Sequence, residues 1–198
     1  MKLYYAPRTC SLSPHIVLQE LDLPFELIRV NNQTKLTAQG EDFRLINPKG
    51  YVAALQLDDG RVLTEGPAIL QYLADLKPEQ GLAPPPGSWQ RVRLQEWLNF
   101  IACELHGGLA PLFNPTLAPV REVFIQRLQL RFALLDQHLA QQAWLLGETF
   151  GVADAYLFTV MGWACHLDID LAPWPALQHY LQRLARRPSV LAALAGEA

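Results

Sequence analysis

A segment rich in proline and glycine divides the chain into two halves with different patterns. Residues 77–88 contain four prolines and two glycines, which interrupt both helices and strands. Strand-like and helix-like stretches alternate before this segment, and only helical spacing follows it. We therefore predict an α/β domain at residues 1–80, a linker at 81–87 and an all-helical domain at 88–198.

The order of elements in the first half specifies its sheet. The patterns predict strands at 2–5, 25–30, 52–57 and 62–63, and helical stretches at 11–21, 43–46 and 65–76. The helix between the first two strands is a crossover, which makes that pair parallel. Asp58-Asp59-Gly60 is typical of a hairpin turn and adds an antiparallel strand. The compact solution is a mixed four-stranded sheet with helices on both faces.

Composition narrows the class of protein. Of the 198 residues, 51% are hydrophobic and 18% are charged, which is enough apolar material for a packed core. The net charge of -3 gives no reason to expect nucleic acid or an anionic membrane. No stretch reaches the roughly 18 uncharged apolar residues that a membrane span needs, and the first residues lack a signal-peptide core. Three cysteines in neither a disulfide framework nor a metal-binding pattern indicate a reducing compartment, the cytoplasm, and no metal.

Cys10 follows a strand and a proline-containing loop and directly precedes a helix. The start of a helix stabilises a thiolate through free N–H groups and the positive end of the helix dipole. Cys10 is thus a candidate low-pKa, accessible thiol, or simply a small residue at a crowded helix start. Cys103 and Cys165 lie in apolar helical patterns, where core packing is the favoured interpretation.

Thr64-Glu65-Gly66 opens a helix after the hairpin. The Glu65 carboxylate can receive an ammonium group while N–H groups around Gly66 bind a carboxylate, which suits the zwitterionic end of an amino acid. The alternative is an acidic first-turn residue that complements the helix dipole. Asp154 follows Gly151 by three residues, and for it the structural interpretation, a capping box, is favoured.

His106 lies on the first long helix of the second half. Helical spacing places residues 99, 103 and 106 on one stripe, which could face a cleft between the domains. A histidine on such a helix can equally be a packed or solvated residue.

Together these motifs resemble the beta-class, cysteine-type glutathione transferases of bacteria. The resemblance rests on residues 1–5 and 10–15, on Asn47-Pro48-Lys49-Gly50, on residues 63–66, 96–99 and 104–106, and on residues 152–158. It runs the full length of the chain. It implies a thioredoxin-like first domain, a homodimer, and a glutathione site on that domain that the partner subunit completes.

The resemblance also implies roles for individual residues. Cys10, Ser11 and His106 would act in catalysis, with glutathione as co-substrate and its thiolate near Cys10 and Ser11. Glutathione would be held by the residues at matching positions: Cys10, Lys35, Val52, Glu65, Gly66, Asn99, Cys103, Glu104, Leu105 and His106. Phe113, Trp163 and His166 are candidate walls of the pocket for hydrophobic electrophiles.

The expected activity is conjugation of the glutathione thiolate to electrophiles, with thiol–disulfide exchange through Cys10 as a second activity. Three positions depart from the family pattern: Ala53 replaces a proline, Gly107 a lysine and Gly151 a serine or threonine. A cis bond costs far more before alanine than before proline, so we expect a trans Val52-Ala53 bond in the unliganded protein. The first two departures favour a rival function, a transferase-shaped ligand-binding or regulatory protein with little catalysis.

Overall fold

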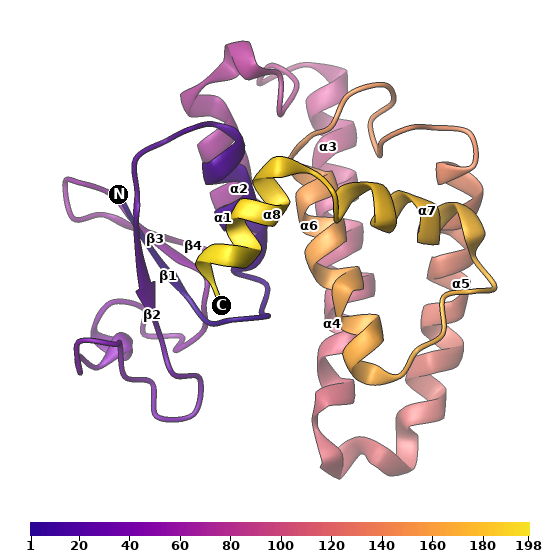
Figure 1. Ribbon diagram of the computed structural model, residues 1–198, viewed down its shortest axis with the longest axis horizontal. Helices are drawn as coiled ribbons and strands as arrows, with labels where there is room; N and C mark the ends of the chain where they lie inside the picture. Colours follow the sequence, from indigo (N-terminus) through magenta and orange to yellow (C-terminus); the bar gives the residue numbers. More distant parts are fainter.

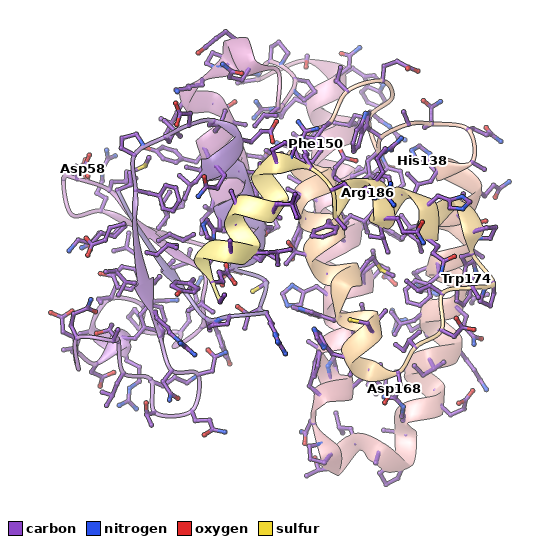
Figure 2. All side chains as sticks on the ribbon, viewed as in Figure 1. Asp58, His138, Phe150, Asp168, Trp174 and Arg186 are labelled. Carbon is purple, nitrogen blue, oxygen red and sulfur yellow. The ribbon has the colours of Figure 1, made fainter.

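The first half forms a four-stranded sheet in the order β2-β1-β3-β4, in a computed structural model that describes residues 1–198. Its strands are β1 (Lys2–Tyr5), β2 (Glu26–Arg29), β3 (Ala54–Gln56) and β4 (Val62–Thr64). β1 pairs in parallel with β2 and antiparallel with β3, and β3 and β4 form the hairpin. The predicted mixed sheet is confirmed. Asp58, in the hairpin turn, lies at the outer end of this half, away from the helical half (Figure 2).

The two faces of the sheet are covered differently. Leu3 and Leu55 point to the face covered by α1 (Leu12–Glu20) and α2 (Gly66–Leu76), in the main hydrophobic core. These helices stand between the sheet and the helical half (Figure 1). Tyr4 points to the opposite face, where a 3₁₀ turn at Phe43–Leu45 places Phe43 5.5 Å from its ring. Only this short turn supplies the helical cover predicted for the second face.

The second half is helical throughout, as predicted. Its helices are α3 (Trp89–Phe100), α4 (Gly107–Leu109), α5 (Arg121–Leu139), α6 (Val152–Met161), α7 (Pro175–Leu184) and α8 (Pro188–Gly196). The first long helix of this half is interrupted, because α3 is followed by a π-helical turn at Ile101–His106, α4 and a 3₁₀ turn at Ala110–Phe113. No helix of the chain combines the length and the apolar character needed to cross a membrane.

The start of α6 is fixed by Asp154, whose side chain is buried. Its carboxylate accepts hydrogen bonds from the N–H groups of Gly151 (2.8 Å) and Leu145 (2.9 Å) and from the hydroxyl of Tyr180 (2.6 Å). Burial raises the pKa of Asp154, and these three donors oppose the shift. The structural interpretation of Asp154 is confirmed.

The chain returns to its first half at the C-terminus. α8 lies beside α1, and the chain ends near the sheet (Figure 1). Arg187 pairs with Glu20, and Nδ1 of buried His15 lies 3.1 Å from Oε1 of Glu197. One hydrophobic core extends from Leu3 through α1 and α6 to α8, so the two halves are packed together.

Two expectations about the backbone and the cysteines are wrong. Cys103 and Cys165 are exposed. Cys103 lies on the outer side of the π-helical turn, and Cys165 on a 3₁₀ turn (Gly162–Leu167) whose buried side carries other residues. The Val52-Ala53 bond is cis, not trans, and both residues are buried where the chain enters β3.

Candidate active site

A cavity with a volume of about 1100 Å³ lies between the two halves. That is enough for a tripeptide and a second small molecule. Its sheet-side wall comes from the β1–α1 turn, the loop before β3 and the start of α2, and its other wall from α3, α4 and α6. Of the predicted site residues it contains Cys10, Lys35, Val52, Glu65, Gly66, Asn99, His106, Phe113 and Trp163.

Cys10 lies in this cavity as a partly buried thiol, two residues before α1. Its Sγ donates a hydrogen bond to the backbone carbonyl of Val52 at 3.3 Å. Burial raises the pKa of Cys10 to about 11, although the N–H groups of Cys10 and Ala53 oppose the shift. The expectation of a low-pKa, accessible thiol is therefore wrong, because burial outweighs the helix start.

Ser11 does not line the cavity, and its side chain is buried. Its hydroxyl oxygen accepts a hydrogen bond from the N–H of Ala6 (3.2 Å) and lies 2.8 Å from Oγ1 of Thr9. Ser11 thus shapes the turn between β1 and α1. The sequence analysis predicted a catalytic role for Ser11 beside Cys10, but the Ser11 side chain points away from the cavity.

Glu65 lies at the start of α2, and its carboxylate is exposed. This is the position predicted from the sequence for a group that binds an ammonium ion. An ammonium group already contacts it, because Nζ of Lys49 lies 2.6 Å from Oε1 of Glu65 and 2.9 Å from Oγ1 of Thr64. Sequence reasoning placed Lys49 in a loop motif but did not foresee this ion pair across 16 residues of chain. Pro67 has no N–H, and that of Ala68 bonds to the Glu65 carbonyl, so Gly66 is the donor that this helix start offers a ligand.

The loop before β3 supplies the next part of the cavity. Val52 lines it, and its carbonyl accepts a hydrogen bond from the Cys10 thiol. Lys35, which reaches the same cavity from the loop after β2, has its ammonium group 5.8 Å from the centre of the exposed Tyr51 ring. The sheet side of the cavity therefore carries three cations, Arg8, Lys35 and Lys49, besides the Glu65 carboxylate.

His106 faces the cavity next to a residue that sequence reasoning missed, Tyr156 on α6. Nδ1 of His106 lies 2.9 Å from the Tyr156 hydroxyl. Burial lowers the pKa of His106, and the Glu65 carboxylate opposes this shift. Burial and the nearby Cys10 and Glu65 raise the pKa of Tyr156. At neutral pH the pair is a hydrogen bond between two uncharged groups.

The polar stripe on the long helix differs from the predicted one. Asn99, Ala102 and His106 line the cavity, whereas Cys103 does not. The π-helical turn at Ile101–His106 is the reason, because its i→i+5 hydrogen bonds change which residues share a face. The helical spacing used for residues 99, 103 and 106 does not hold across it.

The neighbours of His106 are also turned away from the cavity of their own chain. Leu105 is fully buried in the core. Glu104 pairs with Arg131 (2.7 Å) and Arg127 (3.3 Å) on α5, which lowers the pKa of its carboxyl. Leu105 therefore has no side-chain surface for a ligand, and the carboxylate of Glu104 already has two partners.

Aromatic rings form the apolar end of the cavity. The ring of Trp163 lies 4.9 Å from that of His106 and 5.8 Å from that of Phe113, in both cases edge-to-face. Phe113 and Trp163 thus lie where the electrophile pocket was predicted. His166 is exposed and not part of the wall, because the 3₁₀ turn that ends before Asp168 (labelled in Figure 2) turns its side chain outward.

Known proteins match both halves of the chain. The family model "Glutathione S-transferase, N-terminal domain" matches residues 8–76, and "Glutathione S-transferase, C-terminal domain" matches residues 100–188. Glutathione S-transferase GstA of Escherichia coli O157:H7 is 43% identical, over 100% of this chain and 98% of that protein.

Two solved structures superpose along the whole chain. A sphingomonad glutathione S-transferase complexed with glutathione is 43% identical with a TM-score of 0.95, covering 100% of this chain and 98% of that one. The beta-class glutathione S-transferase of Sphingomonas chungbukensis is 42% identical with a TM-score of 0.96, covering 100% and 99%. With these matches to both halves, the chain belongs to the glutathione S-transferase family, and its fold is that of the bacterial beta class.

Proposed function

We propose that this protein conjugates glutathione to hydrophobic electrophiles in the cavity between its two halves. The observation that carries the proposal is the division of that cavity. One end offers charged partners for a tripeptide, the other an aromatic pocket, and the start of α1 lies between them. The glutathione complex of the sphingomonad relative supports the choice of thiol.

Each end of glutathione has a partner of suitable chemistry. The α-ammonium group of the γ-glutamyl residue pairs with Glu65, and its α-carboxylate accepts a hydrogen bond from the N–H of Gly66. The glycyl carboxylate pairs with Lys35, and the backbone of the cysteinyl residue forms hydrogen bonds with the backbone of Val52. The sulfur then lies near Cys10, at the free N–H groups that begin α1.

Catalysis in this scheme comes from a stabilised thiolate and from proximity. The N–H groups at the start of α1 and the N–H of His106 stabilise the negative sulfur, while Phe113 and Trp163 hold the electrophile. The thiolate attacks an electrophilic carbon, a C–S bond forms, and the leaving group departs with the electron pair of its bond. Tyr156 holds the ring of His106 through their 2.9 Å hydrogen bond.

Thiol–disulfide exchange is the second candidate activity, because Cys10 lies in the same cavity. The Cys10 thiolate can attack the glutathionyl sulfur of a mixed disulfide between glutathione and a substrate thiol, which forms a Cys10–glutathione disulfide and releases the substrate thiol. A second glutathione then attacks this disulfide, which yields glutathione disulfide and returns the Cys10 thiol. The raised pKa of Cys10 makes it a poor nucleophile at neutral pH, so conjugation is the main activity.

We further propose a homodimer that works in the cytoplasm. Exposed apolar side chains lie on α3 and α5, among them Trp89, Val92, Leu130 and Leu134. Cys103 and Glu104 lie on the same stretch of chain, outside the cavity of their own subunit, and would reach the partner's glutathione. Three free cysteines are consistent with a reducing compartment.

The test measures glutathione affinity by calorimetry and the rate of conjugation to 1-chloro-2,4-dinitrobenzene. Affinity together with turnover above the uncatalysed rate supports the proposal. Binding of hydrophobic dyes without glutathione affinity would favour the rival, a non-catalytic binding protein. Light scattering tests the dimer, for which we expect twice the 22.3 kDa of one chain.

A further inference from the structure

Arg8 occupies a turn position that suits glycine. The N–H of Thr9 bonds to the carbonyl of Ala6 at 3.3 Å, which closes a four-residue turn with Pro7 second and Arg8 third. The φ angle of Arg8 is 62°. Proline in the second position and positive φ in the third are features of a type II turn, whose third residue is normally glycine or asparagine. A strained arginine at such a place suggests that its side chain has a function.

The turn places Arg8 at the electrophile end of the cavity. The carbonyl of Arg8 accepts a hydrogen bond from Nε1 of Trp163 at 3.1 Å, and Trp163 packs edge-to-face against Phe113. Arg8 lies two residues before Cys10, and all four residues line the same cavity. Arg8 therefore stands beside the aromatic pocket and the point where the glutathione sulfur would lie.

Arg8 is the one cation of the cavity that has neither a carboxylate nor an aromatic ring as its partner. Lys49 pairs with Glu65, and Lys35 lies over the ring of Tyr51. Glu65 is the only carboxylate that lines the cavity, so the cations outnumber it even without His106, whose pKa is lowered. A guanidinium group presents a planar pair of N–H donors that matches a carboxylate. A guanidinium group that stacks on a Phe or Trp ring still has these two donors free to bind the carboxylate.

We propose that Arg8 selects aromatic electrophiles that carry a carboxylate. This inference rests on the proposed conjugation and names its substrate class. The aromatic ring packs against Phe113 and Trp163 while Arg8 binds the carboxylate at the mouth of the pocket. In the substitution, the glutathione thiolate attacks the ring carbon that bears a halogen, the C–S bond forms, and the halide leaves with the C–halogen electron pair. The carboxylate is not consumed.

A matched pair of substrates tests the inference. They are 4-chloro-3,5-dinitrobenzoate and its methyl ester, which react at the same carbon and differ in charge. The measured quantity is the ratio of kcat/KM for the acid to kcat/KM for the ester, each divided by its uncatalysed rate constant. We expect Arg8→Gln to lower this ratio about threefold to tenfold, the range of a partly exposed charge pair. High salt should lower the wild-type ratio and leave that of Arg8→Gln unchanged.

Three further variants separate charge, folding and general electrostatics. Arg8→Lys keeps the charge and should retain part of the preference. Arg8→Gly gives the turn its preferred residue, so it should fold at least as well as the wild type and still lose the preference. Arg29→Gln removes an exposed cation on β2, outside the cavity, and should leave the ratio unchanged. A ratio that is the same in the wild type, Arg8→Gln and Arg8→Gly overturns the inference.

Calorimetry with the two preformed glutathione conjugates separates this inference from the proposed function. If the acid conjugate binds more tightly than the ester conjugate and this difference depends on Arg8, the inference is supported. That holds even if neither substrate is turned over, although absence of turnover would refute conjugation. Turnover of the ester with no effect of Arg8 on either ratio or binding leaves conjugation standing and refutes the role of Arg8. Failure of both conjugates to bind refutes both.

Discussion

The hydroxyl oxygen of Tyr156 lies 2.9 Å from Nδ1 of His106, and the two side chains come from different helical segments of one cavity wall. Tyr156 keeps its proton because burial raises its pKa, and His106 stays neutral because burial lowers its pKa. In the arrangement we propose, the Tyr156 hydroxyl donates to Nδ1, which leaves the proton of the imidazole on Nε2. His106 can then donate that N–H to a sulfur anion while remaining uncharged.

Tyr156→Phe should lower kcat for conjugation about threefold to tenfold, because it removes the donor that holds the His106 ring. The KM for glutathione should change little, since neither the Tyr156 hydroxyl nor the His106 imidazole binds the backbone or the carboxylates of glutathione in the proposed complex. The free energy of unfolding should fall by about 1 kcal/mol, the usual net value of one hydrogen bond. Steady-state kinetics and urea unfolding measure these quantities.

The control for this prediction is Tyr5→Phe, which removes a tyrosine hydroxyl outside the cavity. It should leave kcat unchanged. If Tyr156→Phe lowers stability without changing kcat or the pH profile of kcat, Tyr156 is a packing residue only.

His106 should make the folded protein less stable in mild acid. Its folded-state pKa is lowered from 6.5, so below that value the unfolded chain binds a proton that the folded chain does not. The free energy of unfolding therefore rises with pH through this window and levels off above about pH 6.5, the ordinary pKa of histidine. NMR titration should place the His106 midpoint below 6.5.

The comparison that isolates this contribution is His106→Gln. The difference in unfolding free energy between wild type and variant should shift in favour of the wild type as the pH rises towards 6.5. A difference that is constant between pH 5 and 7, or a midpoint above 6.5, would contradict the assignment.

Glu65→Gln should weaken glutathione binding much more than it weakens the fold. Removing one partner of a charge pair that becomes buried on binding costs about 2–5 kcal/mol of affinity. Glu65 is exposed in the free protein, where its pair with Lys49 contributes at most about 1 kcal/mol to stability. Calorimetry and thermal unfolding give the two effects separately.

Lys49→Gln is the matched variant, since it breaks the same ion pair from the other side. The ammonium group of glutathione replaces Lys49 at Glu65 in the proposed complex, so this variant should bind glutathione as tightly as the wild type or more tightly. Equal losses of affinity in both variants would show that the ion pair itself, rather than the free carboxylate, is what glutathione needs.

The sequence predicted the features that local rules determine. The glycine and proline content of residues 77–88 separated the halves, and the helix start at Gly66 placed Glu65 correctly. Features that depend on contacts between residues far apart in the sequence could not be predicted from it. The pKa of Cys10 depends on burial and on two groups more than forty positions away, the N–H of Ala53 and the carboxylate of Glu65.

Two other errors have physical causes that a sequence pattern cannot show. The π-helical turn at Ile101–His106 changes the face on which Cys103 lies, and no residue type in that turn signals it. Tyr156 is part of an apolar helical run, where a tyrosine is usually a core residue. Its partner His106 is 50 residues away, so its polar role required the structure.

Cys10 should react slowly with alkylating agents at neutral pH and should be dispensable for conjugation. With a pKa of about 11, roughly one Cys10 thiol in a thousand is ionised at pH 8, and the thiolate is the reactive form. Exposed Cys165 should therefore be labelled first by iodoacetamide, and the rate for Cys10 should keep rising up to about pH 11. Cys10→Ala should keep its kcat for conjugation within about threefold, because the attacking sulfur belongs to glutathione. The same variant should lose the mixed disulfide with glutathione, which mass spectrometry detects. Rapid labelling of Cys10 at pH 7, or loss of conjugation in Cys10→Ala with glutathione affinity intact, would mean that Cys10 acts as a thiolate.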